Sequence, residues 1–421
     1  MRRGLWALIV LIVAALAAGG YYALARSVAG PPILVGLLHS RTGPNAASEK
    51  ALIDAEILAL EEINAEGGLL GRPVTWVVAD GRSRDAVFAE QAQRLITIDK
   101  VGVIFGGYSS GSRKSMKPVV EENHHLLIYP AAYEGVEGSS NIVYTGGPAN
   151  QQVAPAVSWC VETLKARKLF LVGTDAIWSR VVSALTRDVV KARGAQVVGE
   201  ECLPPESDEV SAAIEAIKKS TPDAVINTLE GIEANAAFYT QLRQAGFTPD
   251  RLPVVSFNIS EEELRTLPVK DLVGHYSAWN YFQSVERPEN ERFVRKFKAR
   301  YGADRVTCDG VATAYNSVRL WAGAVDQAQT EKVAEVLAAL PRQSLDAAEG
   351  IVTVDPVNLN NWRPFFMGKV RPDGQFEVVF TISKPIPPYP YPRIRPRAEW
   401  EALIADLSKR WGGHWAKPPG S

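Results

Sequence analysis

Short apolar runs alternate with amphipathic segments in the first part of the chain. Each run is followed by a polar or glycine-rich break, and this pattern predicts buried parallel strands joined by helices. Between the first two runs, apolar residues recur at helical spacing from Leu52 to Ile63, and Gly67-Gly68 ends that segment. The expected strands are Ile33–Leu38, Val74–Ala79, Val101–Phe105, Leu126–Tyr129 and Ile142–Tyr144.

The same alternation starts again in the middle of the chain. Here the expected strands are Leu169–Gly173, Val197–Cys202, Ala224–Asn227 and Val254–Phe257, with helical segments between them. Strand–helix alternation of this kind builds a doubly wound α/β sheet. Because the rhythm occurs twice, the predicted fold class is α/β with two Rossmann-like lobes.

The pattern changes past Tyr281. The expected helices are Phe293–Tyr301 and Gly310–Ala328, and the expected strands are Ile351–Val354 and Gly368–Phe380. A turn at Pro372-Asp373-Gly374 divides the last of these into two short strands. The segment from Pro385 is rich in proline and tyrosine, which predicts an extended strap. Glu399–Trp411 predicts a short amphipathic surface helix.

The N-terminal segment has the pattern of a targeting signal. Arg2 and Arg3 precede a run without charged residues from Gly4 to Ala25, and Arg26 ends the run. The run is also long enough to span a bilayer as a helix. Residues 1–30 are therefore expected to be a cleaved signal peptide or a retained anchor in the inner membrane. In both cases the rest of the chain is expected to be periplasmic or otherwise extracytoplasmic.

Composition excludes several classes of protein. Lys and Arg number 46 against 47 Asp and Glu, so the net charge of -1 provides no field for nucleic acid. The three cysteines are too few and too scattered for a zinc cluster or a disulfide scaffold. Cys160 and Cys202 could pair or remain free thiols. We expect no metal and no cofactor.

A glycine-rich turn, Gly106–Gly111, follows the third expected strand and precedes a helix. Gly107-Tyr108-Ser109-Ser110-Gly111 matches the G-x-S-x-G nucleophile elbow, so one hypothesis is a serine hydrolase that uses Ser109. His275 would be its only late histidine within the fold, and no HGGG-like segment precedes the serine. The alternative is a binding loop that presents backbone N–H groups and hydroxyls to a small ligand. We favour binding, and we expect that the protein is not an enzyme.

Further candidate residues follow other strands of the expected sheets. Tyr129 ends a strand, and Tyr133 and Glu134 follow it, while Asp175 and Glu230 each follow a strand of the second lobe. Because parallel strands end at one edge of a sheet, the residues of each lobe are expected to meet at a common mouth. Acidic side chains at this mouth could accept hydrogen bonds from the N–H groups of an amide or amine ligand.

These residues belong to a longer series of motifs. The chain resembles type I periplasmic binding proteins, and within that fold it is similar to the binding proteins for urea and short-chain amides and to the related amide-sensing regulator of amidase expression. The resemblance covers roughly residues 33 to 390. The motifs include His39–Gly43, Glu61–Gly68, Ser112–Ser115, Pro118–Asn123, Tyr129-Pro130, Tyr133–Gly135, Tyr144–Gly146, Pro148–Gln152, Gly173–Asp175, Glu261–Arg265 and Ala278–Phe282.

The resemblance implies two lobes that are joined by three crossover strands and close on a small ligand. The first lobe would comprise 33–150 with 285–345, the second 151–280 with 346–390, and 391–421 would form a C-terminal strap and tail. The implied partners are the permease and ATPase subunits of an ABC importer. The candidate ligand-binding residues are Tyr108, Ser109, Ser110, Tyr129, Ala131, Tyr133, Glu134, Asp175, Trp178 and Glu230.

Departures from the family pattern bear on the ligand. Ala131 replaces a usual Thr, Ala176 and Trp178 stand where tyrosines are common, and Glu230 replaces a neutral residue. These changes favour a somewhat larger amide, or a ligand with an ammonium group such as an amino acid, over urea itself. A sensing module that signals to a partner protein is an alternative to transport.

Overall fold

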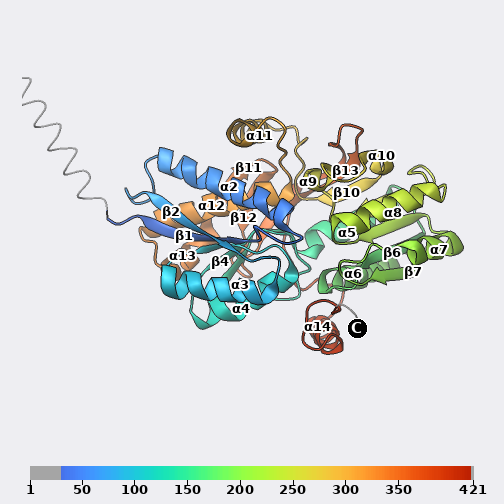
Figure 1. Ribbon diagram of the computed structural model, residues 1–421, viewed down its shortest axis with the longest axis horizontal. Helices are drawn as coiled ribbons and strands as arrows, with labels where there is room; N and C mark the ends of the chain where they lie inside the picture. Colours follow the sequence, from blue (N-terminus) through green and yellow to red (C-terminus); the bar gives the residue numbers. More distant parts are fainter. Residues whose placement is uncertain (1–29, 419–421) are drawn as a thin grey trace, which may run out of the picture.

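The computed structural model describes residues 30–418. Its first sheet has five parallel strands in the order β2-β1-β3-β4-β5 (Figure 1). The strands are β1 (Ile33–His39), β2 (Val74–Asp80), β3 (Ile104–Gly106), β4 (Leu127–Tyr129) and β5 (Ile142–Tyr144). Each overlaps a run expected from the sequence, although β3 begins three residues later than expected. The inner strands are apolar and buried, whereas the edge strand β2 is mostly half-buried.

Helices cover both faces of this sheet, and together they form the first lobe. Helices α2 (Ala46–Ala65) and α12 (Asp309–Ala328) pack together on one face. Helices α3 (Asp85–Arg94) and α4 (Ser110–Glu122) lie on the other. The remaining helices, α11 (Pro288–Tyr301) and α13 (Val333–Ala339), also come from the later part of the chain.

The second sheet has nine strands in the order β11-β12-β13-β10-β9-β8-β6-β7, with β14 paired to β13. Strands β10, β9, β8, β6 and β7 are parallel, and β11 to β14 pair antiparallel. The strands are β6 (Lys168–Thr174), β7 (Gln196–Leu203), β8 (Ala224–Thr228), β9 (Val254–Ser256), β10 (Tyr276–Trp279), β11 (Ser344–Ala347), β12 (Gly350–Val354), β13 (Asn361–Val370) and β14 (Phe376–Ile386).

Helices on the two faces of this sheet complete the second lobe. They are α5 (Ala149–Glu162), α6 (Ile177–Ala192), α7 (Ser211–Ser220), α8 (Ile232–Gln244), α9 (Glu261–Leu264) and α10 (Val269–Leu272). The doubly wound α/β fold expected from the sequence is confirmed, whereas the residue ranges of the two lobes stay a prediction.

Amide side chains connect the segments that cross between the lobes. Gln151 donates from Nε2 to the carbonyl of Asn361 at 2.9 Å. Asn280 donates from Nδ2 to the carbonyls of Pro364 at 2.6 Å and Gln151 at 3.3 Å. The crossings after β5, after β10 and before β13 are therefore fixed to one another, which defines a common hinge.

Two expectations about the C-terminal part need correction. The predicted short strands around residue 372 are the longer β13 and β14, because the exposed positions of β14 hid its strand pattern. The expected surface helix is α14 (Arg397–Arg410), but Trp400 and Trp411 are buried against the second lobe. The three cysteines are free thiols.

Within residues 30–418, no helix combines the length and apolarity needed to cross a membrane. The expected signal peptide or anchor lies outside the described residues.

Candidate functional site

The glycine-rich turn is held in a conformation that only glycine tolerates. Gly106 has φ +153°, and a Cβ there would lie 2.0 Å from the carbonyl oxygen of Leu38. Gly107 has φ +81°, and a Cβ there would lie 2.7 Å from Met116. These two glycines let the chain turn directly from β3 into α4. Strands β3 and β4 are parallel neighbours, so the turn lies beside the loop that follows Tyr129.

Ser109 is a helix cap. Its Oγ accepts a hydrogen bond from the backbone N–H of Ser112 at 3.0 Å, which satisfies a free donor of α4. His275 lies in the second lobe, where its Nδ1 accepts from the N–H of Val254 at 3.1 Å and burial lowers its pKa to about 4. The geometry therefore supports capping by Ser109 rather than activation as a nucleophile.

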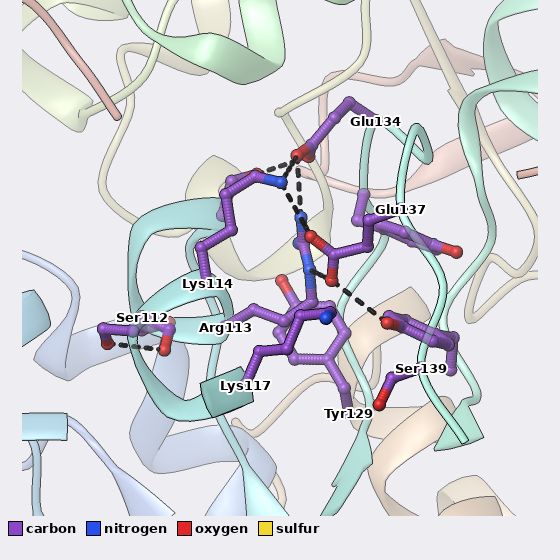
Figure 2. A network of polar contacts seen from close by, with 12 residues as sticks. Ser112, Arg113, Lys114, Lys117, Tyr129, Glu134, Glu137 and Ser139 are labelled. Atoms are coloured by element: carbon purple, nitrogen blue, oxygen red, sulfur yellow. Dashed lines mark hydrogen bonds and ion pairs between the residues drawn. The ribbon is translucent and has the colours of Figure 1, made fainter. Parts of the chain in front are cut away.

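A buried ion network lies behind the turn (Figure 2). Arg113 donates to Glu134 at 2.7 Å and to Glu137 at 2.8 Å, and Lys114 contacts Glu137 at 2.7 Å. Ser110 donates to the other oxygen of Glu134 at 2.5 Å. Charges buried this deeply are stable only when paired and hydrogen-bonded. The network therefore fixes Glu134 at the end of β4.

The predicted tyrosines support this network. The guanidinium of Arg113 lies 5.0 Å from the ring centre of Tyr129 and 4.7 Å from that of Tyr133, within cation–π range. Tyr133 donates to Asn360 at 2.6 Å and stacks on Tyr144 at 4.8 Å. Tyr129 and Tyr133 are fully buried, so they shape the wall of the site from behind.

Tyr108 lies where the lobes meet. Its side chain packs between two apolar clusters of the first lobe. Burial raises the pKa of Tyr108 well above its usual value, and the charge of Glu263 raises it further. Next to it, Ser48 of α2 donates to Glu263 at 2.9 Å, a hydrogen bond between the lobes. Ala131 is buried with the aromatic residues of the first lobe.

Asp175 and Trp178 have structural partners in the second lobe. Asp175 accepts from Nε of Arg180 at 2.7 Å, and its carbonyl accepts from the N–H of Lys417 at 2.8 Å. Trp178 is 7% exposed and packs in the core around α6. The structure therefore assigns both residues local contacts and does not bring Trp178 to the open surface.

Glu230 reaches the first lobe. It follows β8, and its backbone N–H donates to Oγ1 of Thr174 at the end of β6, which sets its position. The side chain remains exposed, yet the surrounding protein raises its pKa to about 7, and the negative charge of Glu134 contributes to this increase. The influence of Glu134 places the two carboxylates within electrostatic range of each other, although Glu134 itself is fully buried in its ion network.

Asp85, the first residue of α3, adds a third carboxylate beside the first turn of α4. A Cβ on Gly111 would lie 2.3 Å from Oδ2 of Asp85, so that carboxylate already lies against the turn. Burial raises the pKa of Asp85. The carboxylates of Asp85 and Glu134 thus both lie against the turn.

The sequence singled out Ser110 and Glu134, which the structure joins by a hydrogen bond, and Glu230, whose pKa the charge of Glu134 influences. It did not single out Arg113 or Glu137 as site residues. A sequence pattern could have identified them. Two adjacent basic residues lie on an otherwise apolar helix face, and acidic residues follow in the next loop, which predicts that they pair. Within residues 30–418, no group of three metal-ligating side chains could hold an ion.

A hollow on the described part of the chain is separate from these residues. It measures about 470 Å³ and lies between Val136 of the first lobe and α14, next to Trp415. A smaller one of about 230 Å³ lies between α11, α12 and β11 on the outside of the first lobe.

Comparison with known proteins identifies similar chains. The model of a family described as periplasmic binding protein domain matches residues 33–397. The Leu/Ile/Val-binding protein homolog 7 of Brucella melitensis is 24% identical over 399 residues, which cover 89% of this chain and 96% of that protein. A limonene hydroxylase of Geobacillus stearothermophilus is 32% identical over 121 residues, but these cover only 29% of this chain and 22% of that protein.

Solved structures with the same fold have different ligands. The branched-chain amino acid binding protein LivJ of Streptococcus pneumoniae, in complex with isoleucine, superposes with a TM-score of 0.74 at 22% identity. The superposition covers 85% of this chain and all of that one. A solute-binding protein of Rhodopseudomonas palustris HaA2, in complex with p-hydroxybenzoic acid, has a TM-score of 0.77 at 21% identity, covering 86% and 100%. At these identities the likeness establishes the fold and leaves the ligand open.

Proposed function

Because the chain belongs to the periplasmic binding protein domain family, we propose that it is an extracytoplasmic binding protein that captures a small solute between its lobes and delivers it to an ABC importer. The proposed solute presents N–H groups, as urea, a short-chain amide or an ammonium group does. The permease and ATPase subunits of the importer are the proposed partners.

The carboxylates of Glu134 and Glu230 carry this proposal. They belong to different lobes, and the pKa of Glu230 is raised mainly by burial and further by the charge of Glu134. Without a ligand, burial and the nearby charge of Glu134 disfavour the ionised form of Glu230 in this arrangement. A ligand that donates N–H bonds to both removes this penalty only in the closed arrangement, so it favours closure.

The surroundings argue for a donor ligand rather than an acidic one. Arg113 and Lys114 are neutralised by Glu134 and Glu137, so their charges are not available to a carboxylate. Glu230 then leaves the cleft acidic. A benzoate, which is bound by one of the structural relatives, would meet repulsion here.

An amino acid is the second candidate. Glu230 supplies a partner for an ammonium group, and the relatives named Leu/Ile/Val-binding proteins lend this class weight. An amide needs only hydrogen bonds, whereas an amino acid also needs a group for its carboxylate. The backbone N–H groups of the glycine-rich turn are the available donors for it.

Calorimetric titration tests the proposal. The panel is urea, formamide, acetamide, propionamide, leucine, isoleucine, valine and 4-hydroxybenzoate, titrated into the wild type, Glu230→Gln and Glu233→Gln. Glu233 is an exposed carboxylate on the adjacent helix and serves as the control. We expect saturable binding of an amide or amino acid that Glu230→Gln weakens and Glu233→Gln does not. Binding of 4-hydroxybenzoate alone would refute the proposed ligand class.

A further inference from the structure

The tail of the chain, residues 413–418, follows α14 and lies beyond the family match, which ends at residue 397. It is fixed to the second lobe by its backbone. The carbonyl of Trp415 accepts from the N–H of Ile177 at 2.9 Å, and the N–H of Lys417 donates to the carbonyl of Asp175 at 2.8 Å. Backbone hydrogen bonds of this kind extend the carboxyl end of β6 and do not depend on the tail's side chains.

The same tail contacts the first lobe through side chains. Lys114 places its Nζ 5.0 Å from the ring centre of Trp415. His414 lies close enough to Asp85 for its charge to lower the pKa of that carboxyl, against the effect of burial. Between Val136 and α14 lies the hollow of about 470 Å³, so this side of the contact is loosely packed.

The two attachments therefore differ in strength. Helix α14 adds to the attachment on the second lobe, since Trp400 is fully buried there and Arg395 makes two hydrogen bonds of 2.7 Å to Asp188 of α6. Figure 1 shows α14 beneath α6. The attachment to the first lobe consists of the cation–π contact between Lys114 and Trp415 and the longer-range attraction between His414 and Asp85. If the lobes separate, the tail stays with the second lobe.

The contact on the first lobe also reaches the candidate site. Lys114, which the Trp415 ring covers, is paired with Glu137 at 2.7 Å and lies 3.7 Å from Glu134. A single side chain thus connects the tail to the carboxylate whose charge influences the pKa of Glu230.

We propose that residues 413–418 form a latch, which remains bound to the second lobe and holds the lobes together through Trp415 on Lys114 and His414 beside Asp85. The latch opposes separation of the lobes and slows release of a bound solute. Its effect on the solute rests on the proposed function, whereas its effect on the lobes does not.

Small-angle X-ray scattering of the unliganded protein tests the latch. The variants are a chain ending at Gly412, which keeps α14 intact, and Trp415→Ala, which removes one half-buried side chain. Asp406→Ala, at an exposed position of α14, is the matched control. Both latch variants should have a larger radius of gyration than the wild type, and the control should not. Equal radii for all four proteins would overturn the proposal, and Trp415→Ala decides alone if the shortened chain does not fold.

Dissociation of the tightest-binding panel solute provides the second readout. Latch removal should accelerate its release at least about fivefold, the lower end of ordinary coupling between sites. Unchanged radii would refute the latch and leave the proposed function standing, whereas larger radii with unchanged release would refute only the effect of the latch on the solute. If no panel solute binds, the scattering result still decides whether the tail holds the lobes together.

Discussion

Replacing Arg113 by methionine tests the physical basis of the candidate site. The Arg113 side chain is fully buried and makes hydrogen bonds to Glu134 at 2.7 Å and Glu137 at 2.8 Å. In Arg113→Met, both carboxylates remain in the interior with only Lys114 as a neighbouring cation. The methionine fills much of the volume, so the main loss is the charge.

Two independent arguments give the size of the expected loss of stability in Arg113→Met. Breaking a buried ion pair by removing one partner costs about 3–5 kcal/mol. Burial alone would raise the pKa of Glu137, but the charges of Arg113 and Lys114 outweigh it and lower this pKa from 4.5 to about 2. At about 1.4 kcal/mol per pH unit, this difference corresponds to about 3 kcal/mol. We therefore expect the free energy of unfolding to fall by about 3 kcal/mol or more at pH 7.

Urea unfolding at pH 7 measures this loss. Lys218→Ala is the control, since Lys218 forms an exposed pair with Glu215 and should change stability by less than about 0.5 kcal/mol. The pH dependence gives a second check. Because the pKa of Glu137 is lowered in the folded protein, its contribution is present above pH 4.5 and is lost as the pH falls toward 2.

The gap in stability between wild type and Arg113→Met should therefore narrow as the solution is acidified from pH 5 toward pH 2. A loss below about 1 kcal/mol at pH 7, or a gap that does not change with pH, would refute the account of the network.

Three further predictions concern other parts of the chain. Burial lowers the pKa of His39, but Glu56 and Glu49 together outweigh it and raise this pKa to about 10. His39→Gln should therefore lower the thermal midpoint at pH 7 and weaken the loss of stability that the wild type shows between pH 6.5 and pH 10. An unchanged midpoint would contradict this. Gly106→Ala should destabilise the protein by more than about 1 kcal/mol in thermal unfolding, while Gly138→Ala, where a Cβ meets nothing within 4 Å, should not. Because the pKa of Glu230 is raised to about 7, its side chain gains negative charge between pH 6 and pH 8. The affinity for a cationic ligand, measured by calorimetry, should therefore increase over this range, and Glu230→Gln should abolish that increase. Equal pH dependence in both proteins would show that another group titrates.

Much of the fold could be predicted from hydrophobic patterning. The inner parallel strands are buried on both faces, so they read as apolar runs, whereas the edge strands β2 and β7 are mostly half-buried. Hydrophobic patterning did not predict strand β10, because Tyr276–Trp279 is short and only its middle residues are fully buried. Strand β14 alternates weakly because most of its residues are exposed or half-buried.

The site could be predicted only in part. Positions at the ends of strands, such as Glu134 and Glu230, follow from the topology of parallel sheets. Their approach from different lobes depends on the relative placement of the lobes, which no local pattern encodes. Trp178 and Trp400 illustrate the same limit, since an aromatic residue on a helix has the same sequence pattern whether it faces a cleft or a core.

The most direct test of the central claim is a crystal structure of the complex with the panel solute that binds most tightly. The account predicts the solute between the lobes, with its N–H groups within hydrogen-bond distance of the carboxylates of both Glu134 and Glu230. A solute that contacts one lobe only, or that occupies the hollow between Val136 and α14, would contradict it.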